Sequence, residues 1–269
     1  MATVENQTYS FEVFERPGKE WSLRKCREIV HELREFASPF LIPLPDYQCL
    51  SLAPGALDDK LLVIVRQGFS PYKIVAFTSS VLIEMPFLKD FDTCTTVLHG
   101  GLTCVSPKMR GSNLTIQLTF HVWSHMAQEY PEGFWTTNVA EVISSLGNFG
   151  IYTRHCYPHP SVSKPLEVQR RIAQEISLHH RVCMDISPEA VFDPDTFVFK
   201  GSNLPGSCFR KDTEDPRYHH RDPRETQYFK ALLGRNEGNE VLQVAFLSMQ
   251  VLLYNLATKK DKSSMLAKL

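Results

Sequence analysis

The sequence lacks an excess of charge of either sign, because 29 Lys and Arg and 30 Asp and Glu give a net charge of −1. A broad nucleic-acid-binding surface would need a clear basic excess. The seven cysteines are an odd number and include no CxxC pair, so neither a disulfide framework nor a zinc knuckle is indicated. The most apolar stretch, residues 237–256, is interrupted by Gln243, Gln250 and Asn255 and is short for a membrane span, which needs about 20 clean apolar residues. We therefore expect no nucleic-acid partner and no membrane partner.

The first residues also lack the basic start and the apolar stretch of a secretory signal. We therefore expect a cytoplasmic protein with reduced thiols. What the chain does have is 269 residues with 43% hydrophobic and 22% charged residues, which is typical of a soluble globular protein with a sizeable core.

One stretch, residues 96–128, joins a strand pattern to a helix pattern. It begins with an apolar run over 97–105 and continues with a polar turn over 106–113. Apolar residues then recur at i, i+4 and i+8, namely Leu114, Leu118 and Val122. N–H groups at a helix N-terminus have no intrahelical partner and favour anions, and Arg110 adds a cation suited to phosphate. Spacing alone leaves two alternatives open, an anion site and an ordinary strand–turn–helix connection.

Strand and helix patterns flank this stretch on both sides. Before it, we predict a helix from Ser22 to about Phe36 and strands over 9–16, 61–66 and 72–85. After it, we predict a short helix over 140–149 and strands over 133–139 and 151–157. This order predicts a mixed sheet with helices on its faces.

The rest of the chain differs in composition, and we predict a boundary between a domain over 1–160 and an extension over 161–269. The extension is predicted to be mainly helical, with a polar loop region over 185–236. Residues 237–256 are apolar nearly all round and predict a last helix. We expect that helix to be buried against the main domain or against a second subunit, which would give a homodimer.

Over about residues 9–157, the element order and the central turn resemble the GNAT superfamily of N-acetyltransferases. The resemblance implies an α/β fold of α+β type, with a mostly antiparallel, V-shaped mixed sheet flanked by helices. Family members bind the pyrophosphate of acyl-CoA in a turn with the pattern Q/R-x-x-G-x-G/A. Arg110 takes the first position of this pattern, whereas Asn113 and Thr115 replace the two smaller residues. Asn is the non-Gly residue that best tolerates the left-handed region, and Thr is bulkier than Ala.

The resemblance also implies which residues bind the co-substrate, acetyl-CoA or another acyl-CoA. Residues 136–140 resemble the Asn-Pro-Ala-like step of the family, although the Tyr that usually follows is absent. The implied cofactor-binding residues are Cys104, Val105, Arg110, Gly111, Ser112, Asn113, Leu114 and Asn138.

Acyl transfer from a thioester to an amine requires a base that removes a proton from the acceptor. Glu84 and His99 are the candidate catalytic residues, because both lie on strands that flank the expected cleft. Glu84 equally fits a solvated strand end, and His99 a core histidine with satisfied hydrogen bonds. His121 and His125 share a helix face, but the sequence indicates no third ligand, so we expect no metal.

Together these features predict an acyl-CoA-dependent acyltransferase that acts on an amine or hydroxyl of a small-molecule acceptor. One alternative is a catalytically degenerate GNAT-fold protein that serves as a binding or assembly module. A second alternative is another acyl-thioester enzyme on the same fold, such as a decarboxylase.

Overall fold

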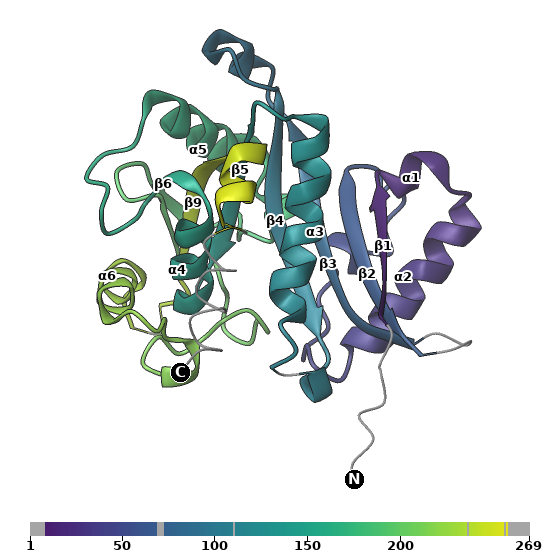
Figure 1. Cartoon of the computed structure of the whole chain (residues 1–269). Helices are drawn as coiled ribbons and strands as arrows, with labels where there is room; N and C mark the ends of the chain where they lie inside the picture. Colours follow the sequence, from purple (N-terminus) through teal and green to yellow (C-terminus); the bar gives the residue numbers. More distant parts are fainter. Residues whose placement is uncertain (1–8, 69–72, 110, 236, 256, 258–269) are drawn as a thin grey trace, which may run out of the picture. The chain divides into compact units, whose positions relative to one another are not determined.

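The computed structural model describes residues 9–257 apart from 69–72, 110, 236 and 256. The strands are β1 (Tyr9–Glu15), β2 (Lys60–Gln67), β3 (Lys73–Glu84), β4 (Thr96–Val105), β5 (Phe134–Ala140), β6 (Arg154–Tyr157), β7 (Val191–Asp193), β8 (Val198–Lys200) and β9 (Glu240–Leu247). The α-helices are α1 (Pro17–Glu20), α2 (Leu23–Ala37), α3 (Leu114–Glu129), α4 (Ile143–Tyr152), α5 (Glu167–His179) and α6 (Pro223–Leu233). The element order predicted for residues 9–157 is confirmed (Figure 1).

The strands follow the order β1-β2-β3-β4-β5-β9-β8-β7, and β6 pairs with β9. β4 and β5 are parallel, whereas the other pairs with a described register are antiparallel. The predicted fold class, a mixed and mostly antiparallel open sheet with helices, is confirmed. Contacts divide the chain into two compact units, Met1–Leu82 with Gly101–Val122 and Ile83–Gly100 with Trp123–Leu269. These units differ from the predicted division at residue 160, which stays a prediction.

In the first unit, α2 and α3 cover opposite faces of the sheet. Neighbouring residues of a strand point to opposite faces of the sheet, so the contacts of Glu12 and Phe11 of β1 show which helix covers each face. Glu12 accepts a hydrogen bond from Arg66 Nε at 3.1 Å, and Arg66 Nη2 also donates to Glu32 of α2 at 2.9 Å. Phe11 stacks at 4.3 Å on the ring of His121, which belongs to α3. The apolar and buried run of β2 from Leu61 to Val65 fits this arrangement, because both faces of the strand are covered.

Two helices, α2 and α3, begin where the sequence predicts. Ser22 is the N-cap of α2, and its hydroxyl accepts from the N–H of Lys25 at 3.3 Å. In α3 the apolar i, i+4, i+8 residues Leu114, Leu118 and Val122 are at most 3% exposed. Burying one such side chain contributes about 1.5–3 kcal/mol, so this stripe fixes which face of α3 packs on the sheet.

In the second unit, the predicted helix over 237–256 is wrong over most of its length. Its first half forms β9 (Glu240–Leu247), which pairs with β5 from Val241 to Leu247 and also pairs with β6 and β8. Helical residues follow only over 249–255. A short apolar run of Val, Leu and Phe fits a strand buried on both faces as well as a buried helix. The predicted homodimer stays a prediction, and most of the apolar residues of β9 on which it relied are buried inside the chain.

The extension is also less helical and less irregular than predicted. Residues 185–236 contain β7, β8 and α6, with Asp222 as the N-cap of α6 and Pro223 in its first turn. Phe229 and Leu233 of α6 lie in a buried cluster with Ile143, Leu146, Val198 and Val241. The Asp-Pro start and the apolar pair at i, i+4 were helix signals that the polar composition of the region obscured.

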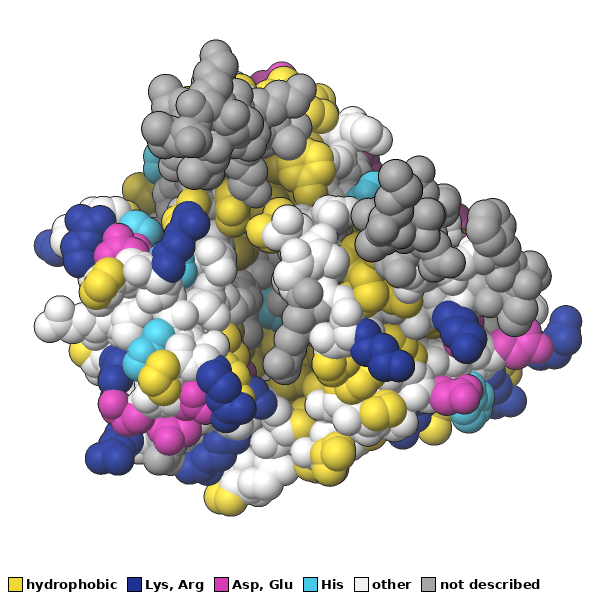
Figure 2. Space-filling view, turned by 60° about the horizontal axis from the view of Figure 1, so that its bottom comes forward, with side chains coloured by type: hydrophobic (Ala, Val, Ile, Leu, Met, Phe, Trp, Pro, Cys, Tyr) yellow, Lys and Arg dark blue, Asp and Glu magenta, His cyan; other side chains and the backbone are white. Residues whose placement is uncertain are grey.

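The distribution of charged side chains on the surface agrees with the balance of acidic and basic residues in the sequence. On the face in Figure 2, acidic and basic side chains lie among hydrophobic and neutral ones and form no patch of one sign. Within the described ranges, no helix combines the length and the apolar character that crossing a membrane requires. The seven cysteines, all of them in described positions, form no disulfide.

Two buried carboxyl groups lie where β5 ends and β9 begins. Glu141 accepts from Asn203 Nδ2 at 3.1 Å and from the Lys211 N–H at 3.0 Å. Glu240 accepts from the Ser202 hydroxyl at 2.5 Å and is 7% exposed. Burial above all, and also the nearby charges of Glu141 and Asp185, raise the pKa of Glu240 to about 7, against the lowering effect of the hydrogen bonds from Ser202 and Asn203.

This arrangement predicts a pH dependence of stability that Glu240→Gln removes. Because the pKa of Glu240 is higher in the folded state than its ordinary 4.5, protonation stabilises the fold at low pH. That stabilisation, about 3 kcal/mol, is lost as the pH rises from 4.5 through 7. Denaturant unfolding at pH 5 and pH 8 measures this loss of stability. Wild type should lose stability over this range, Glu240→Gln should lose much less, and an equal loss in both would contradict the assignment.

Candidate functional site

The candidate co-substrate site begins on the second half of β4, which belongs to the first unit. Cys104 is 5% exposed, and burial raises the pKa of its thiol to about 11. Val105, which follows it, is half-buried. Thr103 between Leu102 and Cys104 points to the other face, where its hydroxyl lies 2.7 Å from that of Thr78. Cys104 is therefore a neutral core thiol, and any contact of this strand with a thioester would come from the backbone.

Gln48 lies against this strand at Gly101, and sequence reasoning missed it. A Cβ at Gly101 would lie 2.4 Å from Gln48 Nε2 and 2.7 Å from the Ser79 carbonyl oxygen. Gln48 is 5% exposed, accepts from the Ser79 hydroxyl at 2.9 Å and donates to the Tyr47 hydroxyl at 3.1 Å. The signal for this close approach was the glycine inside an otherwise apolar strand.

The turn after β4 contains two residues in left-handed backbone conformations. Gly111 and Asn113 both have positive φ, 81° and 60°. Asn113 therefore occupies the left-handed region, which Asn tolerates better than other non-Gly residues. Its carbonyl accepts from the Gln117 N–H at 3.0 Å, which begins α3, and the Ser112 hydroxyl donates to the Met109 carbonyl at 2.6 Å.

The start of α3 is also electrostatically suited to a negative group. Leu114 is 2% exposed and fixes the first turn on the sheet, whereas Thr115 and Ile116 are exposed. The first turn contains no acidic residue, and Lys108 lies exposed in the preceding turn. The N–H groups of this first turn have no intrahelical acceptor, and the helix dipole favours an anion beside them. Arg110 lies outside the described residues.

Glu84, one of the two candidate bases, ends β3 and belongs to the second unit. It accepts hydrogen bonds from the hydroxyls of Thr95 at 3.3 Å and Thr96 at 3.0 Å. Thr96 and His99 are three residues apart on β4, so their side chains point to opposite faces. The two candidate bases therefore do not converge on one point.

His99, the other candidate base, is 1% exposed, and its Nδ1 lies 3.0 Å from the Thr137 hydroxyl of β5. Asn138, the next residue of β5, is half-buried and donates to Gln243 Oε1 of β9 at 3.4 Å. Both side chains thus have protein partners in the second unit. A base or ligand role for either one stays a prediction.

His121, the first of the two histidines on α3, packs against the sheet of the first unit. Its ring stacks on Phe11, and burial lowers the pKa of the imidazole. The stacking gives this histidine a packing role without a metal.

Comparison with known proteins gives matches in structure only. No family model matches the sequence, and no curated protein matches it. The chain is similar in fold to GNAT N-acetyltransferases. Arabidopsis thaliana NAA60 in complex with acetyl-CoA matches with 10% identity and a TM-score of 0.43, over 89% of this chain and 99% of that chain.

Two further matches are more partial. A GNAT family N-acetyltransferase (YhbS) from Escherichia coli in complex with CoA has 15% identity and a TM-score of 0.30, over 56% of this chain and 72% of that chain. Tetrahymena GCN5 has 12% identity and a TM-score of 0.33, over 53% and 73%. At these TM-scores the matches carry no argument about activity, so a function must be argued from this chain's own residues.

The contact at Gly101 predicts that Gly101→Ala destabilises the protein by about 1–3 kcal/mol, because the new methyl group meets Gln48 and the Ser79 backbone. Gly100→Ala is the matched control, since its Cβ would meet only the Thr137 carbonyl oxygen, at 3.4 Å. Chemical denaturation of both variants measures the difference. Equal stabilities would show that Gln48 moves aside at no cost.

Proposed function

We propose that this protein is an acyl-CoA-dependent acyltransferase, with acetyl-CoA or another acyl-CoA as co-substrate. The observation that carries the proposal is the conformation of the turn before α3. Asn113 has a φ of 60° and Gly111 a φ of 81° at the place where the family pattern has its pyrophosphate-binding turn. Leu114 holds the following first turn against the core, so its N–H groups have a fixed direction.

The chemistry of this turn suits a pyrophosphate. Two phosphate groups carry several acceptor oxygens and at least two negative charges, and they bind well to several N–H donors at a helix N-terminus. Gly111, Ser112 and Asn113 contribute backbone groups in this proposal, and Arg110 contributes a guanidinium. The carbonyl of the thioester would be polarised by a backbone N–H near Cys104 or Val105, as the resemblance implies.

The acceptor in this proposal is the amine or hydroxyl of a small molecule. Acidic and basic residues are balanced along the chain, so no charged groove is indicated that would recruit a charged polymer. Glu84 and His99 remain the proposed bases, and Asn138 a proposed ligand. Glu84 is the better candidate of the two, because it is exposed and a substrate can reach it, whereas His99 is 1% exposed.

The rival function, a binding or assembly module without transferase activity, has lost one of its supports. It relied on an apolar final helix available to a partner, but residues 240–247 form β9 and are buried except for Phe246. No described residue favours the decarboxylase over the transferase.

The proposed function predicts that acetyl-CoA and CoA bind and that the turn decides their affinity. Asn113→Val should weaken binding at least tenfold, because a β-branched residue at positive φ is strained by about 1–3 kcal/mol. Asn113→Gly should keep or strengthen binding, and Arg110→Ala should weaken it by removing a phosphate contact. Calorimetric titration at millimolar ligand concentration measures all three.

Thr119→Ala is the control for these variants. Thr119 lies one turn after Thr115 on α3, and its hydroxyl donates to the Thr115 carbonyl at 3.0 Å, so it is not part of the first turn. This variant should bind CoA like the wild type. Absence of binding by the folded wild-type protein would overturn the proposed function.

A further inference from the structure

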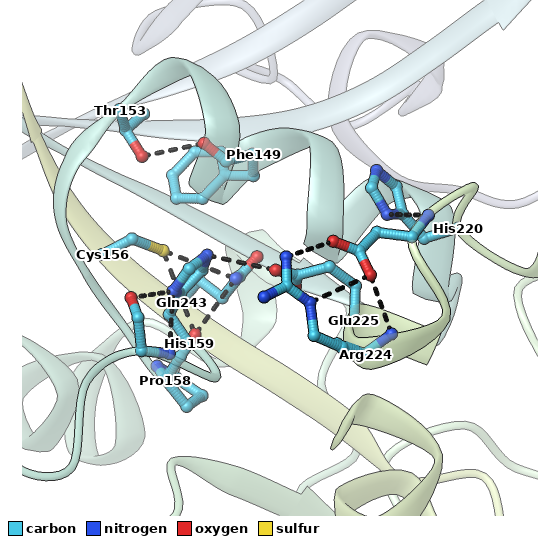
Figure 3. A network of polar contacts seen from close by, with 11 residues as sticks. Phe149, Thr153, Cys156, Pro158, His159, His220, Arg224, Glu225 and Gln243 are labelled. Atoms are coloured by element: carbon cyan, nitrogen blue, oxygen red, sulfur yellow. Dashed lines mark hydrogen bonds and ion pairs between the residues drawn. The ribbon is translucent and has the colours of Figure 1, made fainter. Parts of the chain in front are cut away.

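A second polar cluster lies in the second unit, away from the residues assigned above. The Ser161 hydroxyl is 2.8 Å from His159 Nδ1, and His159 Nε2 is 3.3 Å from Glu225 Oε1. Figure 3 shows the side chains of His159 and Glu225 pointing toward one another, with Glu225 coming from α6. The order hydroxyl–imidazole–carboxyl is that of a nucleophile, its base and the group that orients the base.

The hydrogen bonds decide which ring nitrogen carries the proton. The N–H of Ser161 donates to His159 Nδ1 at 3.3 Å, so Nδ1 is an acceptor. The proton therefore lies on Nε2, which donates to the Glu225 carboxylate. Burial lowers the pKa of His159 from its ordinary value, so the ring is neutral at pH 7. A neutral imidazole with its lone pair toward a hydroxyl is the state in which it can accept the hydroxyl proton.

The imidazole has a fixed position. Gly150 of α4 leaves room for it, because a Cβ there would lie 2.5 Å from His159 Cδ2. Side-chain exposures are 19% for His159 and 11% for Glu225, whereas Ser161 is exposed. The base and its partner are thus shielded while the hydroxyl is open to a ligand from solvent.

Among the described residues, His159 is the partner of the Glu225 carboxylate. Its Oε2 is buried and has no hydrogen-bond partner among the described residues. Burial raises the pKa of Glu225, which makes its carboxylate a stronger acceptor, while the nearby charges of His220 and Arg224 oppose this shift and that of Asp222 adds to it. A basic carboxylate beside Nε2 stabilises the imidazolium that forms when Nδ1 takes a proton.

We propose that Ser161 is a nucleophile that accepts an acyl group from an activated ester or thioester, with His159 as its base and Glu225 as a positioning residue. In the first step the Ser161 oxygen bonds to the acyl carbon and its proton moves to His159 Nδ1. The bond from carbon to the alkoxide or thiolate then breaks, and the leaving group takes that proton. Water, with His159 again as base, releases the carboxylic acid and restores Ser161, without any change in oxidation state.

This activity does not depend on the proposed CoA turn, since all three residues belong to the second unit. The test treats the full chain with a fluorophosphonate probe and identifies the modified peptide by mass spectrometry. We expect the adduct on Ser161 and none in Ser161→Ala. Ser163→Ala is the matched control, because Ser163 is also exposed and lies two residues further on. It should react like the wild type.

The two partner residues have separate expected effects on the rate of labelling. His159→Ala should lower it by about 10²–10⁴, the usual contribution of a general base. Glu225→Gln should lower it at least tenfold and shift its pH midpoint to lower pH, because the imidazolium loses a neighbouring carboxylate. The other charged groups near this carboxylate, His220, Asp222 and Arg224, are unchanged in that variant.

A folded wild-type protein without an adduct on Ser161 would overturn the proposal. The hydrogen bond between Ser161 and His159 would then serve only to stabilise a turn. The same conclusion would follow if His159→Ala, with an unchanged melting temperature, reacted like the wild type. Neither result bears on CoA binding, which the calorimetric titration measures separately. Failure here and failure of the proposed transferase are therefore distinguishable.

Discussion

The second unit depends on the pairing of β9 with its neighbours. β9 comes from the end of the described chain, yet β5 pairs along one edge and β6 and β8 pair along the other. Because both edges are used, its N–H and C=O groups have partners, and a strand with six of eight apolar residues can be buried. Residues more than 100 positions apart in sequence thereby become neighbours in one sheet.

Polar side chains around β9 fix how the other elements meet it. Gln169 of α5 donates to the Val244 carbonyl at 2.8 Å and to the His155 carbonyl, while its Oε1 accepts from the Leu166 N–H. Gln243, which is fully buried, donates to the Pro158 carbonyl at 3.2 Å. Each amide would be costly to bury without these partners. The same pairing orders the loop that carries His159, so the proposed nucleophile site depends on β9 as well.

The first unit depends on a different constraint, the close approach of backbone and side chains at β4 and at the turn after it. Gly101 gives Gln48 room at the centre of the strand, and Gly111 and Asn113 turn the chain into α3. Asn113 provides the left-handed conformation without being glycine. The proposed co-substrate turn thus keeps a left-handed residue at position 113 although Asn stands there in place of glycine.

The sequence by itself predicted the order of the main strands and helices of residues 9–157 and the start of α2 at Ser22, because these depend on periodicity and capping within a few residues. It also allowed the left-handed conformation found at Asn113, since Asn tolerates that region better than other non-Gly residues. It did not distinguish a helix from a strand over 240–247, since a run apolar on all sides fits both, and only pairing with β5 decided it. The contacts of Gln48 with Gly101 and of His159 with Glu225 were likewise decided by the tertiary structure. They join residues 53 and 66 positions apart, and no local pattern records which distant side chains will meet.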